Sequence, residues 1–264
     1  MIGLGSYSFF WEQSDTNPSP LSLIGAFEQT RALDVSLFQI CDYAPLETMS
    51  EAEIREAARV AHELGIRIQL GTKGLEPDRL RRFLRLADAF GADLVRSMVS
   101  GPHWSPTHSE ARDALNQVHT EYTGAGVTLA LETYEQISTP ELVSLVTAVD
   151  GDWLGICLDP ANVVARLEDP RTCVEVCAPH VRNIHVKDFA FHRQAGCVGF
   201  SYSGERMGEG LHDYSHLRET VRPQERNIDE IVEHWVPWQG DPRTTISVER
   251  EWTRATLDYL RRMS

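Results

Sequence analysis

The sequence predicts a single (β/α)8 barrel, an α/β fold of the TIM-barrel type. Short β-branched runs alternate with longer segments of helical period along all 264 residues, and eight such runs can be counted. An open doubly wound sheet is the runner-up, but no G-x-G-x-x-G turn follows any of the runs. No linker rich in Ser, Gly or Pro divides the chain, so we expect residues 1–264 to form one domain.

The expected strands are "IGLGSYS", "ALDVSLFQIC", "IRIQLG", "ADLVRSMV", "GVTLALE", "WLGICLD", "VRNIHVKD" and "TTISVER". Between them, Ser50 and Glu53 predict a helix that starts with a capping box, and Pro77 and Pro140 suit the first turns of two more. A helix is also expected over about residues 108 to 124, and "WTRATLDYLRRM" predicts the last one. The stretch from about 188 to 226, after the seventh strand, is expected to be a long active-site loop with an extra helix.

Charge and composition narrow the classes of partner. A formal net charge of −14 disfavours nucleic acid and anionic lipid surfaces, which leaves a small-molecule substrate. No apolar stretch approaches the roughly 20 residues needed to cross a bilayer, and no basic leader opens the chain, so we expect a cytoplasmic protein. Five cysteines without a C-x-x-C pair indicate reduced thiols. A homo-oligomer is left open.

Side-chain alternation brings four residues to one end of the predicted barrel. Alternate residues of a barrel strand face the axis, and functional side chains lie at the C-terminal rim. If the last acid or histidine of each late strand points inward, its apolar neighbours point outward toward the helices. Four consecutive strands then place one polar group each at the same rim: Glu132, Asp159, His185 and Glu249.

These four residues together favour a metal site. Any one acid could simply be a rim residue paired with an arginine, but four groups in register would repel one another if they were left unpaired. Three carboxylates and one imidazole suit Mn²⁺, Mg²⁺ or Co²⁺, and Zn²⁺ is compatible. We therefore expect one divalent metal ion per chain.

The segments "LALET", "CLDPAN", "IHVKD", "GEGLHD" and "ISVER" resemble the sugar-phosphate isomerase/epimerase superfamily with the xylose-isomerase-like barrel. Ketose 3-epimerases, hydroxypyruvate isomerase and inosose dehydratase belong to this superfamily. The resemblance covers nearly the whole chain. It implies that Glu132, Asp159, His185 and Glu249 bind the metal and that Glu132 and Glu249 form the catalytic acid/base pair.

Further side chains are candidates for substrate binding, each with a structural alternative. Lys187 could contact a substrate oxygen or a neighbouring acid, and Asn162 could contact substrate or cap a helix. Arg206 could reach the substrate from a glycine-containing loop or remain solvated. The aromatic residues Tyr7 and Trp104, with His103, could wall the pocket or pack in the core.

The expected activity is that of an isomerase or epimerase acting on a small carbohydrate or ketose through a metal-stabilised enediolate. A lyase on the same site, either a dehydratase or a decarboxylase of a 3-oxo sugar acid, ranks second, because the same enediolate can lose a hydroxyl group or arise by loss of CO₂. An abasic-site endonuclease and a noncatalytic sugar-binding protein rank lower. The negative charge counts against the nuclease.

Overall fold

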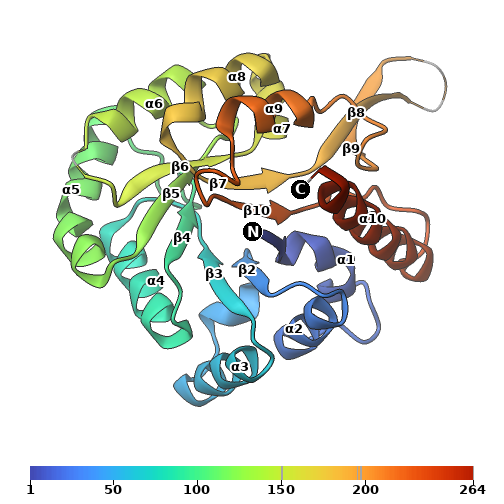
Figure 1. Ribbon diagram of the computed structural model, residues 1–264, viewed down its shortest axis with the longest axis horizontal. Helices are drawn as coiled ribbons and strands as arrows, with labels where there is room; N and C mark the ends of the chain where they lie inside the picture. Colours follow the sequence, from blue (N-terminus) through green and yellow to red (C-terminus); the bar gives the residue numbers. More distant parts are fainter. Residues whose placement is uncertain (150, 195, 197, 264) are drawn as a thin grey trace.

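Eight parallel strands close into a barrel, and helices surround it (Figure 1). The computed structural model describes the chain except for residues 150, 195, 197 and 264. Around the barrel the strands follow the order β1 (Ile2–Gly5), β10 (Asp229–Val232), β7 (Val181–Val186), β6 (Leu154–Leu158), β5 (Thr128–Glu132), β4 (Leu94–Ser97), β3 (Arg67–Gly71) and β2 (Leu37–Cys41). The predicted fold class is confirmed.

The helices between the strands begin where the capping residues predict. Ser50 and Glu53 form the expected capping box, and Pro77 and Pro140 lie in first turns. The α-helices are α1 (Phe10–Gln13), α2 (Leu23–Ala32), α3 (Glu51–Glu63), α4 (Pro77–Phe90), α5 (His108–Ala125), α6 (Thr139–Thr147), α7 (Pro160–Val163), α8 (Pro170–Cys177), α9 (Tyr214–Val221) and α10 (Pro242–Met263). Short 3-10 helices are η1 (Ser6–Phe9), η2 (Ala44–Glu47), η3 (Val164–Arg166) and η4 (Ala178–His180).

The inward and outward faces of the strands follow the predicted alternation. Leu129 and Leu131 of β5 pack in the large core between the barrel and the helices, whereas Ala130 packs with Cys157 inside the barrel. The interior also holds a layer of amides. Gln39 donates to Gln69 (3.1 Å) and to Asn183 (3.0 Å), so this buried layer is hydrogen-bonded rather than apolar.

The prediction of the eighth strand is wrong. "TTISVER" lies in α10, and the eighth strand is β10, which precedes it. Asp241 accepts hydrogen bonds from the backbone N–H (2.9 Å) and hydroxyl (2.7 Å) of Thr244, which starts a helix just before the expected strand. Buried residues then recur with helical spacing, at Thr245, Glu249, Trp252, Thr256 and Leu260.

The stretch after β7 contains more structure than a loop with one helix. It forms an antiparallel hairpin of β8 (Asp188–Arg193) and β9 (Phe200–Glu205), which projects beside α9 (Figure 1). The expected extra helix is α9. Gly204 fits where β9 passes the segment after β10, because a Cβ atom there would lie 2.5 Å from the carbonyl oxygen of Trp235.

Two predictions from composition concern the cysteines and membrane-spanning segments. Cys41, Cys157, Cys173 and Cys177 form no disulfide, whereas Cys197 lies outside the described part of the chain. In the same part of the chain, we find no helix with the length and apolar character that spanning a bilayer requires.

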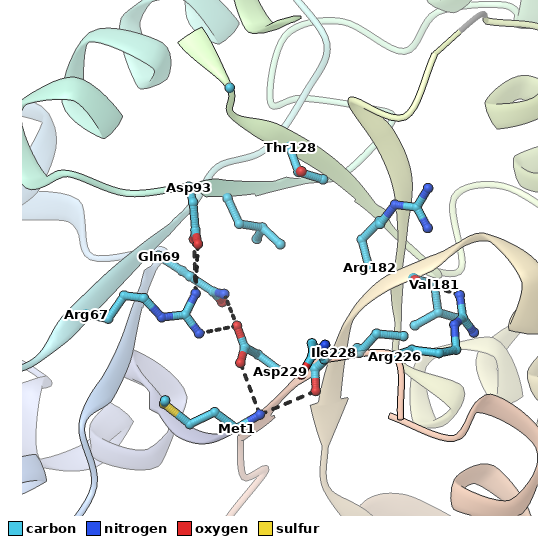
Figure 2. Close-up of a pocket in the computed structure, with 13 residues that line it drawn as sticks. Met1, Arg67, Gln69, Asp93, Thr128, Val181, Arg182, Arg226, Ile228 and Asp229 are labelled. Carbon is cyan, nitrogen blue, oxygen red and sulfur yellow. Dashed lines mark hydrogen bonds and ion pairs between the residues drawn. The ribbon is translucent and has the colours of Figure 1, made fainter. Parts of the chain in front are cut away.

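The N-terminal end of the barrel contains a cavity of about 710 Å³, which Figure 2 shows. Arg67 lies there between Asp93 (2.9 Å) and Asp229, and Gln69 donates to Asp229 (2.8 Å). Arg67, Asp93 and Asp229 thus form ion pairs with one another beside the starts of β3, β4 and β10. Because active sites of this fold lie at the opposite end, we interpret these contacts as structural.

Candidate active site at the C-terminal rim

His185 lies at the centre of the candidate site, fully buried near the end of β7. The side-chain nitrogen of Gln39 donates to Gln69 and Asn183, so the Gln39 oxygen faces His185 Nε2 at 2.8 Å. His185 Nε2 must therefore carry the proton. This leaves the lone pair of Nδ1 available on the other side of the ring.

Three carboxylates surround His185 Nδ1. The nearest oxygens are those of Glu132 at 3.3 Å, Glu233 at 3.4 Å and Asp159 at 3.8 Å. Glu132 ends β5, Asp159 follows β6 and Glu233 follows β10, so strand ends position all three. Glu233 occupies the place for which the sequence had indicated Glu249.

Two buried cations partly balance these acids. Arg96 of β4 forms an ion pair with Glu132, and Lys187 Nζ lies 2.5 Å from Asp159 and 3.2 Å from Glu233. The Lys187 ammonium also lies 4.2 Å from the centre of the Trp235 ring, a cation–π contact. Burial acts to lower the pKa of Lys187, but Asp159 and Glu233 raise it above its ordinary value, so the ammonium stays charged.

The pKa shifts reveal a strongly negative field at His185. Burial would raise the pKa of Glu132, yet Arg96 and then His185 hold it below its usual range. For His185, burial favours the neutral form, but Cys157, Glu233 and Glu132 raise its pKa well above the ordinary value. A field that attracts a proton this strongly also favours a bound cation, which would compete with that proton for Nδ1.

The residues fit a divalent metal ion. Ligand atoms of Glu132, Asp159 and His185 lie within 4.8 Å of one another, and so do those of Cys41, His185 and Glu233. The atoms His185 Nδ1 and Glu233 Oε1 are buried and make no hydrogen bond. Buried polar atoms without hydrogen bonds are rare, and a metal ion between them would satisfy both. Cys41 contributes to the second group, but burial raises the pKa of its thiol.

Glu249 lies outside this cluster. It is a buried residue of α10, and its carboxylate accepts the backbone N–H groups of Trp11 (2.8 Å) and Glu12 (3.1 Å). It therefore holds α1 against α10. The prediction that Glu249 shares a strand rim with the other three is wrong, because a helix, not a strand, carries it.

Lys187 and Asn162 are placed within the cluster. Asn162 Nδ2 donates to Glu132 Oε1 at 2.9 Å and to the Thr133 carbonyl at 3.1 Å, which fixes the orientation of Glu132. The helix-cap alternative for Asn162 is wrong, because Asp159 caps α7. A substrate contact by Lys187 or Asn162 remains a prediction.

The other substrate candidates lie at varied positions. Tyr7 donates a hydrogen bond to Asp42 at 2.8 Å, beside β2. Trp104 is half-buried against the core and His103 is exposed. Arg206 forms ion pairs with Glu209 (2.5 Å) and Glu251 (2.8 Å) at the surface, and a substrate contact by Arg206 remains a prediction.

Asp188, the last polar residue of "IHVKD", organises the loop that contains "GEGLHD". Its carboxylate accepts the backbone N–H groups of Gly208 (2.9 Å), Gly210 (3.0 Å) and His212 (2.9 Å). Sequence reasoning missed this role, together with Glu233 and Arg96. Asp241 and Pro242 are typical of the start of a helix, and this signal could have placed the last strand earlier in the sequence, just before Glu233.

Comparisons with known proteins identify the family of this chain. Residues 27–263 match the family model described as a xylose isomerase-like TIM barrel. The chain belongs to this family. It is 47% identical to the 3-oxo-isoapionate decarboxylase of Pectobacterium atrosepticum over 259 residues, which cover 98% of this chain and 94% of the relative.

Solved structures of the family share the fold at low identity. D-psicose 3-epimerase from Clostridium cellulolyticum H10, described with D-tagatose, has a TM-score of 0.72 at 16% identity, covering 98% of each chain. A xylose isomerase-like TIM barrel protein from Mycobacterium smegmatis, described in complex with magnesium, has a TM-score of 0.70 at 16% identity, covering 96% of this chain and 95% of that one. At this identity the likeness concerns the fold alone.

Proposed function

We propose that this chain is a divalent-metal-dependent decarboxylase of a 3-oxo sugar acid. The observation that carries the proposal is the 47% identity to a 3-oxo-isoapionate decarboxylase over 98% of this chain. The proposal reverses the order expected from the sequence, in which isomerase or epimerase ranked before lyase. The metal would be held by Glu132, Asp159, His185 and Glu233.

The reaction makes modest demands on the protein. The bond between the carboxylate carbon and the adjacent carbon breaks, CO₂ leaves, and the electron pair passes through that adjacent carbon toward the ketone oxygen. One proton must then be added to the carbon that carried the carboxylate. When bound, a divalent ion supplies a Lewis acid that stabilises negative charge on the ketone oxygen.

The side chains of the cluster suit single proton delivery. Both oxygens of Glu132 are engaged, one by Asn162 and one by Arg96, so this residue is held as a carboxylate. Glu233 Oε1 accepts no hydrogen bond, and Glu233 Oε2 faces Lys187. Glu233 Oε1 would therefore bind the metal, and the charged ammonium of Lys187 is the group that we assign to proton delivery. Epimerisation would instead require one group to remove a proton and a second to return one.

The test is CO₂ release from 3-oxo-isoapionate, the substrate that the relative's name gives. Protein loaded with Mg²⁺ or Mn²⁺ should release one CO₂ per substrate consumed, and protein stripped with a chelator should not. Absence of CO₂ release, together with interconversion of ketoses such as D-psicose, would replace this proposal with the isomerase or epimerase alternative.

A further inference from the structure

The ammonium group of Lys187, to which we assign proton delivery, has neighbours on more than one side. It lies 2.5 Å from Asp159 and 3.2 Å from Glu233. Its Nζ atom also lies over the Trp235 ring, 4.2 Å from the ring centre. An ammonium group carries three hydrogens, and the two acids engage two of them. The acids and the ring together therefore determine where the third hydrogen can point.

Trp235 can hold a charged ammonium group without accepting its proton. The face of an indole ring attracts a cation, and the attraction is stronger where water is excluded. The Lys187 side chain is only 3% exposed, so the ring takes a place that water would occupy at a surface lysine. When Asp159 and Glu233 bind a divalent ion, they attract the ammonium less. The neutral ring is then the neighbour whose attraction for Lys187 does not change.

The hairpin of β8 and β9 supports the Trp235 ring. The Tyr202 ring of β9 packs against it at 78°, with 5.8 Å between the ring centres. The Tyr202 hydroxyl donates to the Ala161 carbonyl at 2.7 Å, which ties the hairpin to α7. Gly204 lies two residues farther along β9, on the same face as Tyr202, and leaves room there for the Trp235 backbone. The ring is thus held by the hairpin as well as by its own segment.

We propose that Trp235 is a positioning residue, whose ring, supported by Tyr202, keeps the ammonium group of Lys187 directed at the substrate. The inference rests on the proposed function. In that reaction the ammonium gives one proton to the carbon that has lost CO₂, and the neutral amine that remains regains a proton from solvent. Trp235 acts through Lys187, so the role requires no contact between the indole ring and the substrate.

Lysine NMR signals report this contact directly, because the chain contains two lysines, Lys73 and Lys187. In protein labelled with ¹³C-lysine, the ring current of Trp235 should move the ε-methylene protons of Lys187 upfield of those of Lys73. Trp235→Leu should remove this displacement, whereas Trp235→Phe, which keeps an aromatic face, should retain part of it. Tyr202→Leu should reduce the displacement as well, because the indole ring then loses its support.

Turnover of the same variants tests the consequence for the reaction, as CO₂ release from 3-oxo-isoapionate by Mn²⁺-loaded protein. Trp235→Leu should lower kcat at least about tenfold, because a displaced proton donor is costly, and should change KM less. Trp235→Phe should recover much of kcat. Trp238→Leu is the matched control, because it removes a 45% exposed indole ring of the same segment that packs against Trp11 instead. It should leave the lysine signals and kcat unchanged.

The inference is overturned if the wild type shows no upfield displacement of Lys187, or if Trp235→Leu loses the displacement but keeps the wild-type kcat. If Trp235→Leu does not fold, Tyr202→Leu decides by the same two measurements. The two proposals fail separately. Without CO₂ release by the wild type the proposed function fails, and the lysine signals alone then decide whether Trp235 positions Lys187. With CO₂ release, an unchanged kcat in Trp235→Leu refutes only the role of Trp235.

Discussion

Replacing Glu233 and Glu249 by glutamine, one at a time, separates a metal ligand from a structural residue. Both are buried glutamates near the C-terminal rim, and the sequence alone favoured Glu249 as the ligand. The structure places Glu233 at 3.4 Å from His185 Nδ1 and places Glu249 on the backbone of α1. The two substitutions should therefore affect different properties.

For Glu233→Gln the expected loss is functional. The amide removes one of three negative charges around the metal, and replacing even a residue that only hydrogen-bonds to a ligand typically costs about 10- to 100-fold in metal affinity. We expect metal affinity to fall at least about 100-fold. Turnover in saturating metal should also fall at least about tenfold, because glutamine no longer forms the ion pair that orients the Lys187 ammonium. The melting temperature of the metal-free protein should change little.

For Glu249→Gln the expected loss is in stability. The carboxylate accepts two backbone N–H groups and the amide can accept only one, so one hydrogen bond to a charged acceptor is lost, about 1.5–3 kcal/mol. Burial raises the pKa of Glu249 to about 8, so the group is mostly protonated near pH 7, and a loss of about 1–2 kcal/mol, as for a hydrogen bond between neutral groups, is the better expectation. In a protein of this size that lowers the melting temperature by about 2–8 °C.

The assay combines metal titration, calorimetric melting and CO₂ release for both variants. Glu249→Gln should keep its metal and turn over substrate within about tenfold of the wild type below its melting temperature. If Glu249→Gln loses metal while Glu233→Gln retains it, the assignment of the fourth ligand from the position of β10 is wrong.

Three further predictions follow from individual contacts. Gln39→Ala should weaken metal binding about 10- to 100-fold, because Gln39 no longer holds the proton of His185 on Nε2. Gln29 donates a hydrogen bond to Glu12 instead, so Gln29→Ala should leave metal binding unchanged in the same titration. Acidification should weaken metal binding by about tenfold per pH unit where one proton competes for His185 Nδ1, and a pH-independent dissociation constant would exclude that ligand. Burial raises the pKa of Glu230 from 4.5 to about 7, so the folded state keeps a proton that the unfolded chain releases. The stability of the wild type should therefore fall by up to about 3 kcal/mol as the pH rises from 4.5 to 7. Glu230→Gln should remove this fall. If denaturant melts of the wild type show no such fall, or if the variant shows the same fall, the raised pKa of Glu230 is wrong.

The sequence predicts the strand ends correctly where inward and outward side chains alternate clearly along the strand. In β5, β6 and β7 an acid or histidine ends a run of outward β-branched or leucine residues, so the inward positions of Glu132, Asp159 and His185 follow from the period of two. The barrel fold itself follows from the repeated change between strand segments, with a period of two residues, and helical segments, with a period of 3.6 residues. These features are local, so one sequence is enough to reveal them.

The last strand could not be recognised in the same way. β10 has four residues, two of them acidic, and buried acids are not expected in a strand. Glu230 is accommodated only because Tyr214 of α9 donates a hydrogen bond to it, a contact between distant segments. By contrast, "TTISVER" alternates by chance within a helix whose buried face continues at helical spacing. Tertiary contacts, not local pattern, decided both cases.

The ion pairs of the site also lay beyond sequence reasoning. Arg96 stands in an apolar strand, and its pairing with Glu132 depends on the register of β4 against β5. The link from Lys73 to Asp42 joins the ends of two other strands. Such contacts depend on barrel closure.

The fate of the substrate in D₂O separates decarboxylation from isomerisation or epimerisation. Metal-loaded protein and 3-oxo-isoapionate would be followed by carbon and deuterium NMR, with metal-stripped protein as the control. We expect one CO₂ and one deuterium, on the carbon that carried the carboxylate, for each substrate consumed, and no reaction without metal. Deuterium exchange into a ketose such as D-psicose, with no CO₂ from the 3-oxo acid, would contradict it.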